Sequence, residues 1–295
     1  MAFRFTGFTD EAEKMLAGQI EVLEEAGWNA MEPRLVDGKS VCDLNDAEWD
    51  RAFSMLRHHG ITVVGFGGQI GNWARPITSD FAIDLAELKR VAPRMRQSGT
   101  KLLRIMTYPN PEDHPWSTES WKAEVVRRLR ELSAVAEDED VILGCENCSG
   151  YAGAGPEGFL ELAEAVNSRA FKLIFDTGNS SLDHDDLESS WRYYEACQSE
   201  IVHVHIKAAK PGPDGSLVPC FPDEDPMQRK ILSNLVATGY DGWLSIEPHM
   251  CAVIHEGREA EDKKARSTWI EYASRLEKLV AQCCPTAAYG SDINV

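Results

Sequence analysis

Acidic and imidazole side chains stand at or near the ends of four successive apolar runs in the second half of this sequence. They are Glu146, Asp176, His205 and Glu247. A single acidic residue in such a position is ordinary, because it can be a satisfied polar contact or the start of a loop. Four successive runs that supply Glu, Asp, His and Glu indicate that these side chains act together.

The chemistry that suits this set is metal binding. Three carboxylates held close together in a partly buried place would repel each other strongly. A divalent cation removes that cost, and a set of oxygen and nitrogen ligands suits Mn, Mg, Co or Zn. The pattern therefore predicts one bound divalent metal ion, with Mn expected first and Mg, Co or Zn as alternatives. The competing interpretation is a structural polar layer without a metal.

His203 and His205 both lie in the seventh apolar run, and either could be the imidazole ligand. We expect their side chains to point to opposite sides of the strand, so that only one ring faces the interior. The residues alone do not choose between the two.

The elements that must position these side chains alternate along the whole chain. Short β-rich runs predict strands at 3–8, 30–33, 61–66, 101–106, 141–146, 171–176, 201–206 and 242–247. Apolar residues at helical spacing predict helices at 10–26, 45–59, 80–97, 120–136, 157–167, 187–197, 226–238 and 264–283.

Alternation of strands and helices over this length leaves an open doubly wound sheet or a closed barrel. Eight strand–helix units favour an α/β protein with a single (β/α)8 TIM barrel domain over residues 1–284, followed by a flexible tail at 285–295. In such a barrel the carboxyl ends of the strands meet at one mouth, where active sites lie. The four candidate ligands would therefore converge.

Composition narrows the partners. The chain has 295 residues, 43% of them hydrophobic, and a formal net charge of −18. Strong acidity disfavours attraction to nucleic acids and anionic membranes, so neither is an expected partner. The sequence has no evident secretory signal and no apolar stretch long enough to span a bilayer, which predicts a cytoplasmic protein. Its eight cysteines are expected to be reduced thiols.

Several motifs resemble a known family. The sequence is similar to the xylose isomerase-like barrels, the superfamily of sugar phosphate isomerases and epimerases that also contains endonuclease IV, from about Phe5 to His249. The most specific pieces are EN (146–147), FDTGN (175–179), HVHIK (203–207) and GYDGWLSIEPH (239–249). Weaker echoes are GQIG (68–71) and LRIMTY (103–108).

The resemblance implies roles for individual residues. It makes Glu146, Asp176, His205 and Glu247 the metal ligands, and it selects the second histidine of the His-x-His pair. It also makes Glu146 and Glu247 the catalytic acid and base. Polar neighbours at the mouth would bind substrate hydroxyls, namely Arg104, Lys207, His249 and Asn179.

The sequence also departs from its relatives. Asn179 stands where epimerases often carry His. Epimerases also often have an Arg after the histidine of the seventh strand, where this chain has Lys-Ala-Ala-Lys (207–210), and the Asp that many relatives carry after the lysine is Ala208 here. Substrate identity is therefore open.

The leading functional hypothesis is a divalent-metal-dependent isomerase or epimerase of a small carbohydrate. A proton leaves a carbon next to a carbonyl, a metal stabilises the enediolate, and carboxylates move the proton. A lyase, either a dehydratase or a glycoside-cleaving β-eliminase on an oxidised sugar, begins with the same step and stays open as the alternative.

Phosphodiester cleavage, as in endonuclease IV, is disfavoured by the eight histidines and the acidity. A non-enzymatic sugar-binding barrel is disfavoured by the paired carboxylates. Assembly into a homo-oligomer is left open.

Overall fold

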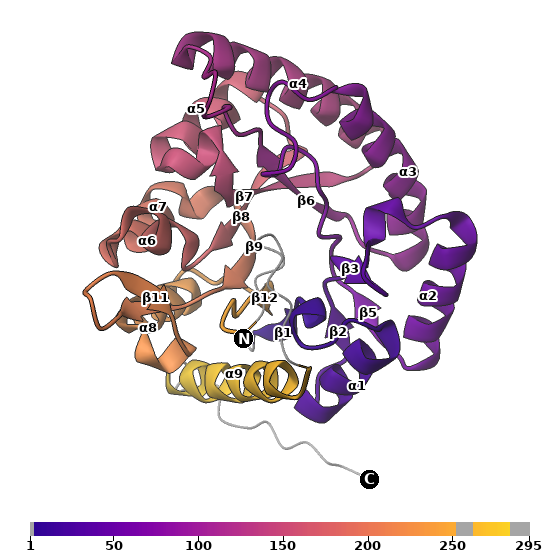
Figure 1. The fold of residues 1–295 in the computed structure, drawn as a ribbon, viewed down its shortest axis with the longest axis vertical. Helices are drawn as coiled ribbons and strands as arrows, with labels where there is room; N and C mark the ends of the chain where they lie inside the picture. The colour runs from indigo at the N-terminus through magenta and orange to yellow at the C-terminus, as the bar shows by residue number, and fades with distance from the viewer. Residues whose placement is uncertain (1–2, 252–261, 284–295) are drawn as a thin grey trace.

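The computed structural model of the chain describes residues 3–251 and 262–283. The segment 285–295, for which we predict a flexible tail, lies outside the described residues. Within them, strands form an inner ring and helices surround it (Figure 1). The predicted α/β barrel is confirmed.

Among the described residues, eight parallel strands build the inner ring. Six form one sheet in the order β1-β12-β9-β8-β7-β6, and β2 pairs with β5. Their bounds are β1 (Arg4–Gly7), β2 (Ala30–Met31), β5 (Thr62–Val63), β6 (Leu102–Thr107), β7 (Ile142–Gly150), β8 (Phe171–Asp176), β9 (Ile201–Ile206) and β12 (Trp243–Ile246). Backbone hydrogen bonds beyond the short strands close the ring: Glu32 donates to Gly7, and Phe66 donates to Leu102.

The outer ring consists of helices that cover the strands (Figure 1). They are α1 (Leu16–Ala26), α2 (Asp46–His58), α3 (Ala82–Ser98), α4 (Thr118–Asp138), α5 (Pro156–Val166), α6 (Asn179–His184), α7 (Glu188–Cys197), α8 (Pro226–Ala237) and α9 (Asp262–Cys283). The strand faces that turn outwards carry buried apolar residues such as Phe175, Val204 and Leu244, which join the helices in the hydrophobic core.

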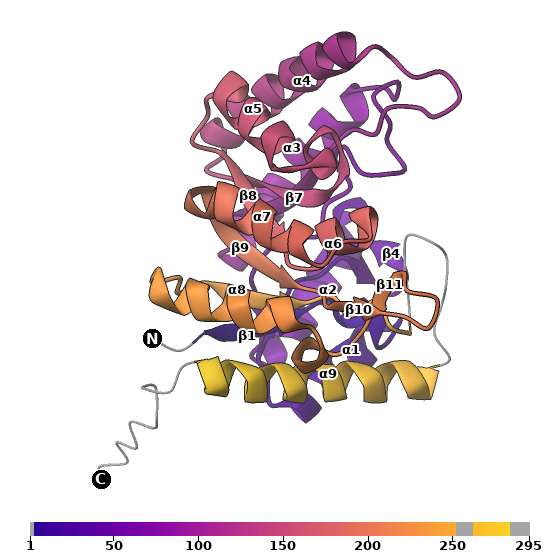
Figure 2. The same ribbon diagram turned by 90° about the vertical axis from the view of Figure 1, so that its left-hand side faces the viewer.

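Three local features differ from the sequence-based expectation. The first helix begins at Leu16, because Thr9–Glu11 form a separate 3-10 turn at the end of β1. Strands β2 and β5 are shorter than predicted. Two small hairpins were not predicted: β3 (Leu35–Val36) with β4 (Lys39–Ser40), and β10 (Ala209–Pro211) with β11 (Leu217–Pro219). The β10–β11 hairpin lies at the same end of the barrel as α6 (Figure 2).

Among the described residues, none of the helices has the length and apolar content that crossing a membrane requires. The seven described cysteines are all free thiols.

Candidate active site

The four candidate ligands converge at the carboxyl ends of their strands. Strand pairing sets Asp176 of β8 directly beside His205 of β9, and Glu146 lies on the neighbouring strand β7. Glu247 follows β12. Each offers one donor atom, and the four atoms lie within 4.8 Å of one another. All four residues are buried, with exposures of 0–3%.

The hydrogen bonds of Asp176 test whether a metal fits. Its Oδ1 accepts the backbone N–H groups of Gly178 and Asn179 at 2.8 and 2.7 Å. Its Oδ2 is buried and accepts no hydrogen bond from the described residues. A buried carboxylate oxygen without a donor is costly unless a cation neutralises it. Together with the mixed oxygen and nitrogen donor set, this oxygen fits a divalent metal.

Lys207 already brings positive charge to the same place. Its Nζ donates to Asn179 Oδ1 at 2.7 Å and lies 3.1 Å from Glu247 Oε2 and 3.5 Å from Asp176 Oδ2. Burial favours the neutral amine, but the carboxylates of Asp176 and Glu247 outweigh it and raise the pKa of Lys207. The side chain is therefore a fixed ammonium at physiological pH.

Glu146 is held from two sides. Arg104 Nη1 lies 3.2 Å from its Oε2, and Asn179 Nδ2 donates to its Oε1 at 3.2 Å. Burial by itself would raise the pKa of the Glu146 carboxyl. The Arg104 guanidinium and His205 counteract burial, and the pKa lies below its ordinary value. Glu146 is therefore an ionised carboxylate.

Glu247 lies beside a guanidinium, an imidazole and the Lys207 ammonium. Its Oε1 accepts from Arg34 Nη1 at 2.6 Å, and His249 Nε2 lies 3.2 Å away. Burial opposes ionisation, but the Lys207 ammonium, a hydrogen bond from His249 and the Arg34 guanidinium outweigh it and hold the pKa of Glu247 well below its usual range. Asp176 differs, since burial dominates there and raises its pKa to about 6 despite Lys207. The two outer glutamates are thus the more firmly ionised carboxylates.

With this geometry in view, the comparisons with known proteins decide the family. The chain matches the xylose isomerase-like TIM barrel family over residues 20–273. The chain belongs to this family. A search of curated proteins gave no significant match.

Solved structures of the xylose isomerase-like type share the fold. One is a xylose isomerase-like TIM barrel protein from Mycobacterium smegmatis in complex with magnesium (16% identity, 95% of this chain and 97% of that one, TM-score 0.67). A second is D-psicose 3-epimerase from Clostridium cellulolyticum H10 with D-tagatose (14%, 94% and 99%, 0.69). A third is 3-keto-D-glucoside 4-epimerase from E. coli (14%, 94% and 99%, 0.64). At these identities the likeness establishes the fold.

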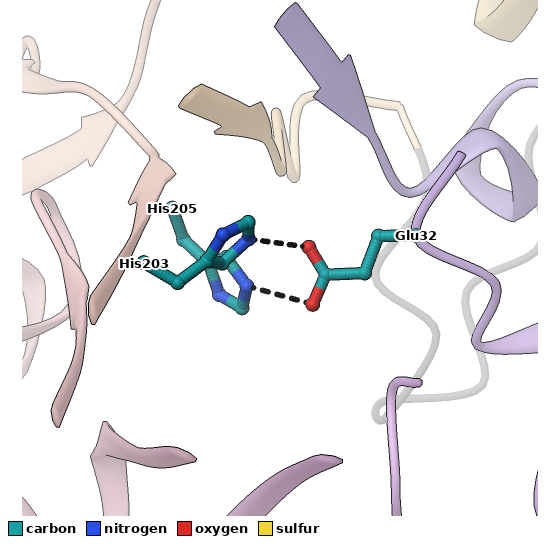
Figure 3. Close-up of side chains that lie close together, drawn as sticks. All are labelled: Glu32, His203 and His205. Carbon is teal, nitrogen blue, oxygen red and sulfur yellow. Dashed lines mark hydrogen bonds and ion pairs between the residues drawn. The ribbon is translucent and has the colours of Figure 1, made fainter. Parts of the chain in front are cut away.

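The expectation for the two histidines was wrong. Residues two apart on a strand share a face, because side chains alternate with a period of two. In this xylose isomerase-like barrel both rings point inwards and meet one carboxylate, that of Glu32 (Figure 3). The distances are 2.8 Å from His203 Nε2 to Oε2 and 3.2 Å from His205 Nε2 to Oε1. Only His205 also reaches the four-residue set, through Nδ1 at 3.2 Å from Glu146 Oε1.

Sequence reasoning missed a second group at the mouth, centred on Arg34. Its guanidinium is buried and donates to Asp10 at 2.8 and 3.2 Å, to Glu11 at 3.3 Å and to Glu247 at 2.6 Å. It also stacks over the Phe8 ring at 4.5 Å. The signal that could have found this group is the one used for the later strands, namely polar residues directly after an apolar strand.

Glu11, Glu247 and His249 also bring three potential ligand atoms together. Arg34 already pairs with both carboxylates of that group, whereas in the four-residue set it pairs with Glu247 alone.

The four residues for which we predict substrate contacts all lie against the candidate ligands. Arg104 and Asn179 contact Glu146, and Lys207 and His249 contact Glu247. His249 does so from a left-handed backbone conformation, with φ of 50°, which non-glycine residues seldom adopt. Such conformations concentrate at functional sites. That these four residues contact a substrate stays a prediction.

Proposed function

We propose that the protein is a divalent-metal-dependent isomerase or epimerase that moves a proton next to the carbonyl of a carbohydrate. The observation that carries the proposal is the pair of buried, ionised carboxylates, Glu146 and Glu247, within one set of potential metal ligands. Two of the structural neighbours are named as sugar epimerases, which supports a carbohydrate substrate.

The two glutamates approach the reacting carbon from different strands. In the sheet, β8 and β9 separate β7 from β12, so Asp176 and His205 lie between the carboxylates. One carboxylate takes the proton from the carbon, and the other returns a proton to the substrate. Glu146, Asp176, His205 and Glu247 would hold the metal, which supplies Lewis-acid stabilisation of the negative charge on the substrate's carbonyl oxygen. The Lys207 ammonium lies beside these ligands and would also stabilise the negative charge on that carbonyl oxygen.

The test is a screen of the Mn-loaded protein in deuterated water with a panel of ketoses and keto-glycosides. Deuterium incorporation next to the carbonyl, with a new isomer or epimer and no lost group, is the expected result. Glu247→Gln serves as the control that keeps the fold but lacks the base. Loss of a leaving group would replace the proposal with a lyase, and no exchange with any member would count against proton abstraction.

A further inference from the structure

Glu32 is a buried carboxylate that the proposed reaction does not use. It follows β2 and has an exposure of 0%, and it faces β9 across the barrel interior (Figure 3). Each of its oxygens contacts one ring nitrogen: Oε2 lies 2.8 Å from His203 Nε2, and Oε1 lies 3.2 Å from His205 Nε2. A buried charge is costly unless hydrogen-bonded partners compensate it, and here both oxygens have such partners.

The chemistry of a carboxylate fixes the donors. An ionised carboxylate only accepts hydrogen bonds, so both Nε2 atoms must carry hydrogen. Nδ1 of His205 faces the Glu146 carboxylate, so without a metal that nitrogen donates a hydrogen as well. A metal that replaced the Nδ1 proton would leave a neutral ring with its hydrogen on Nε2 and its lone pair on Nδ1. That atom is the one directed at the four-residue set, 3.2 Å from Glu146 Oε1.

We propose that Glu32 is a positioning residue that holds His205 as the Nε2–H tautomer and so presents Nδ1 to the metal. The inference rests on the metal site of the proposed function. Metal-bound histidines usually donate their other ring N–H to such a partner, which fixes the ring and strengthens the ligand.

His203 completes the arrangement. Its N–H occupies the second oxygen of Glu32, and its ring packs at a right angle to the ring of His205, with centroids 5.2 Å apart. The carboxylate is therefore held at both oxygens, which keeps Oε1 aimed at His205. The three residues also bring three potential ligand atoms together. Two metal equivalents per chain would make them a second metal site and would overturn the proposal.

The first experiment measures the affinity of the metal-free full chain for Mn²⁺ by calorimetry. Glu32→Gln keeps the shape, but its amide has one oxygen to accept and one nitrogen that donates, so it cannot accept from both rings. We expect its affinity to be about 10–100-fold weaker than that of the wild type. His203→Gln is the matched control. It keeps an N–H for Glu32 and leaves the bond to His205, so its loss should stay below about tenfold.

The second experiment needs no change at Glu32. NMR of the ring nitrogens in the Zn²⁺-loaded wild type should show His205 with its proton on Nε2 and its metal on Nδ1. A proton on Nδ1, or a folded Glu32→Gln that binds Mn²⁺ as tightly as the wild type, would overturn the inference. Failure of the wild type to bind metal would instead remove the proposed function itself, so the two failures are distinguishable.

Discussion

Glu247 combines two tasks at the level of a single residue. As a candidate ligand it contributes charge to the metal, and as a candidate base it must exchange a proton with the substrate. Arg34, Lys207 and His249 surround its carboxyl group, and the charges of Lys207 and Arg34 favour its ionised form. A change from Glu to Gln separates the tasks, because the amide oxygen can still coordinate while the basic carboxylate is gone.

We expect Glu247→Gln to retain part of its metal while turnover falls by about 10²-fold or more, the scale of a lost acid or base group. Elemental analysis gives the metal content, and the deuterium exchange rate gives turnover. Excess Mn should not restore the activity. Full rescue by metal would mean that Glu247 is only a ligand.

Asp176→Asn should behave differently, because Asp176 has no predicted role in proton transfer. Its Oδ2 is buried and accepts no hydrogen bond from the described residues, with Lys207 Nζ 3.5 Å away. We expect activity to fall mainly through weaker metal binding, so a titration with Mn should recover part of it. Activity that stays flat across the Mn titration would contradict this assignment.

At the level of elements, a glycine-rich loop takes the place of most of the third strand of the barrel, of which only the short β5 remains. Beyond β5 the chain runs along β6: Arg104 donates its backbone N–H to Phe66, Met106 donates to Ile70, and Tyr108 donates to Gly71. Gly71 has φ of 63°, and a Cβ there would lie 2.5 Å from the Met106 carbonyl oxygen. The close approach of this loop fixes the strand that carries Arg104.

Gly71→Ala should therefore destabilise the fold by about 1–3 kcal/mol beyond the backbone strain, because the methyl group overpacks the contact with β6. Gly60→Ala is the matched control. Its φ of 67° is similar, and a Cβ there would meet no atom of the described residues within 4 Å. Urea midpoints of the two variants compare the effects. Equal losses would show that only the positive φ matters.

Helix α4 carries a carboxylate whose ionisation depends on its neighbours. Glu124 accepts hydrogen bonds from Arg127 at 2.7 Å and from Arg128 at 2.9 Å. The hydrogen bond from Arg127 lowers its pKa to about 2, against partial burial. Because the folded-state pKa is lowered, its contribution is present above the unfolded pKa and is lost as pH falls towards 2.

Glu124→Gln should thus lower the urea midpoint at pH 7, and the gap to the wild type should shrink at pH 4. Glu131→Gln, which removes a more exposed partner of Arg127 on the same helix (49% against 23% side-chain exposure), should have a smaller effect. A gap that is the same at both pH values would contradict the assignment.

For the whole molecule, the metal and the fold should be thermodynamically linked. A ligand that binds only the folded state stabilises it by mass action, about 2.7 kcal/mol at a hundredfold excess over Kd. For a chain of this size that corresponds to a rise of about 4 °C in Tm. We expect a chelator to lower Tm and Mn to restore it, with about one metal per chain by elemental analysis. Asp176→Asn should show a smaller rise, and a wild type that neither retains metal nor responds to Mn would refute the site.

Much of this molecule followed from the sequence because it depends on local periodicity. Buried parallel strands read as apolar runs and amphipathic helices repeat every 3.6 residues, so the barrel was predictable. The carboxyl ends of the strands meet at one mouth, so Glu146, Asp176, His205 and Glu247 were predictably neighbours. Their roles as ligands and catalysts stay predictions.

Only the tertiary structure decided which side chains pair across the barrel. Glu32 meets His203 over a sequence separation of 171, and Arg34 meets Glu247 over 213. Neither pairing follows from the periodicity of one element. Closure of the ring makes Glu32, at the end of β2, face His203 on β9, and it brings Arg34, in the loop after β2, to Glu247 at the end of β12. Side-chain length and burial then select the partners, since each buried charge must find an opposite one. The strand order could be read along the chain, but the contacts across the interior required the closed barrel.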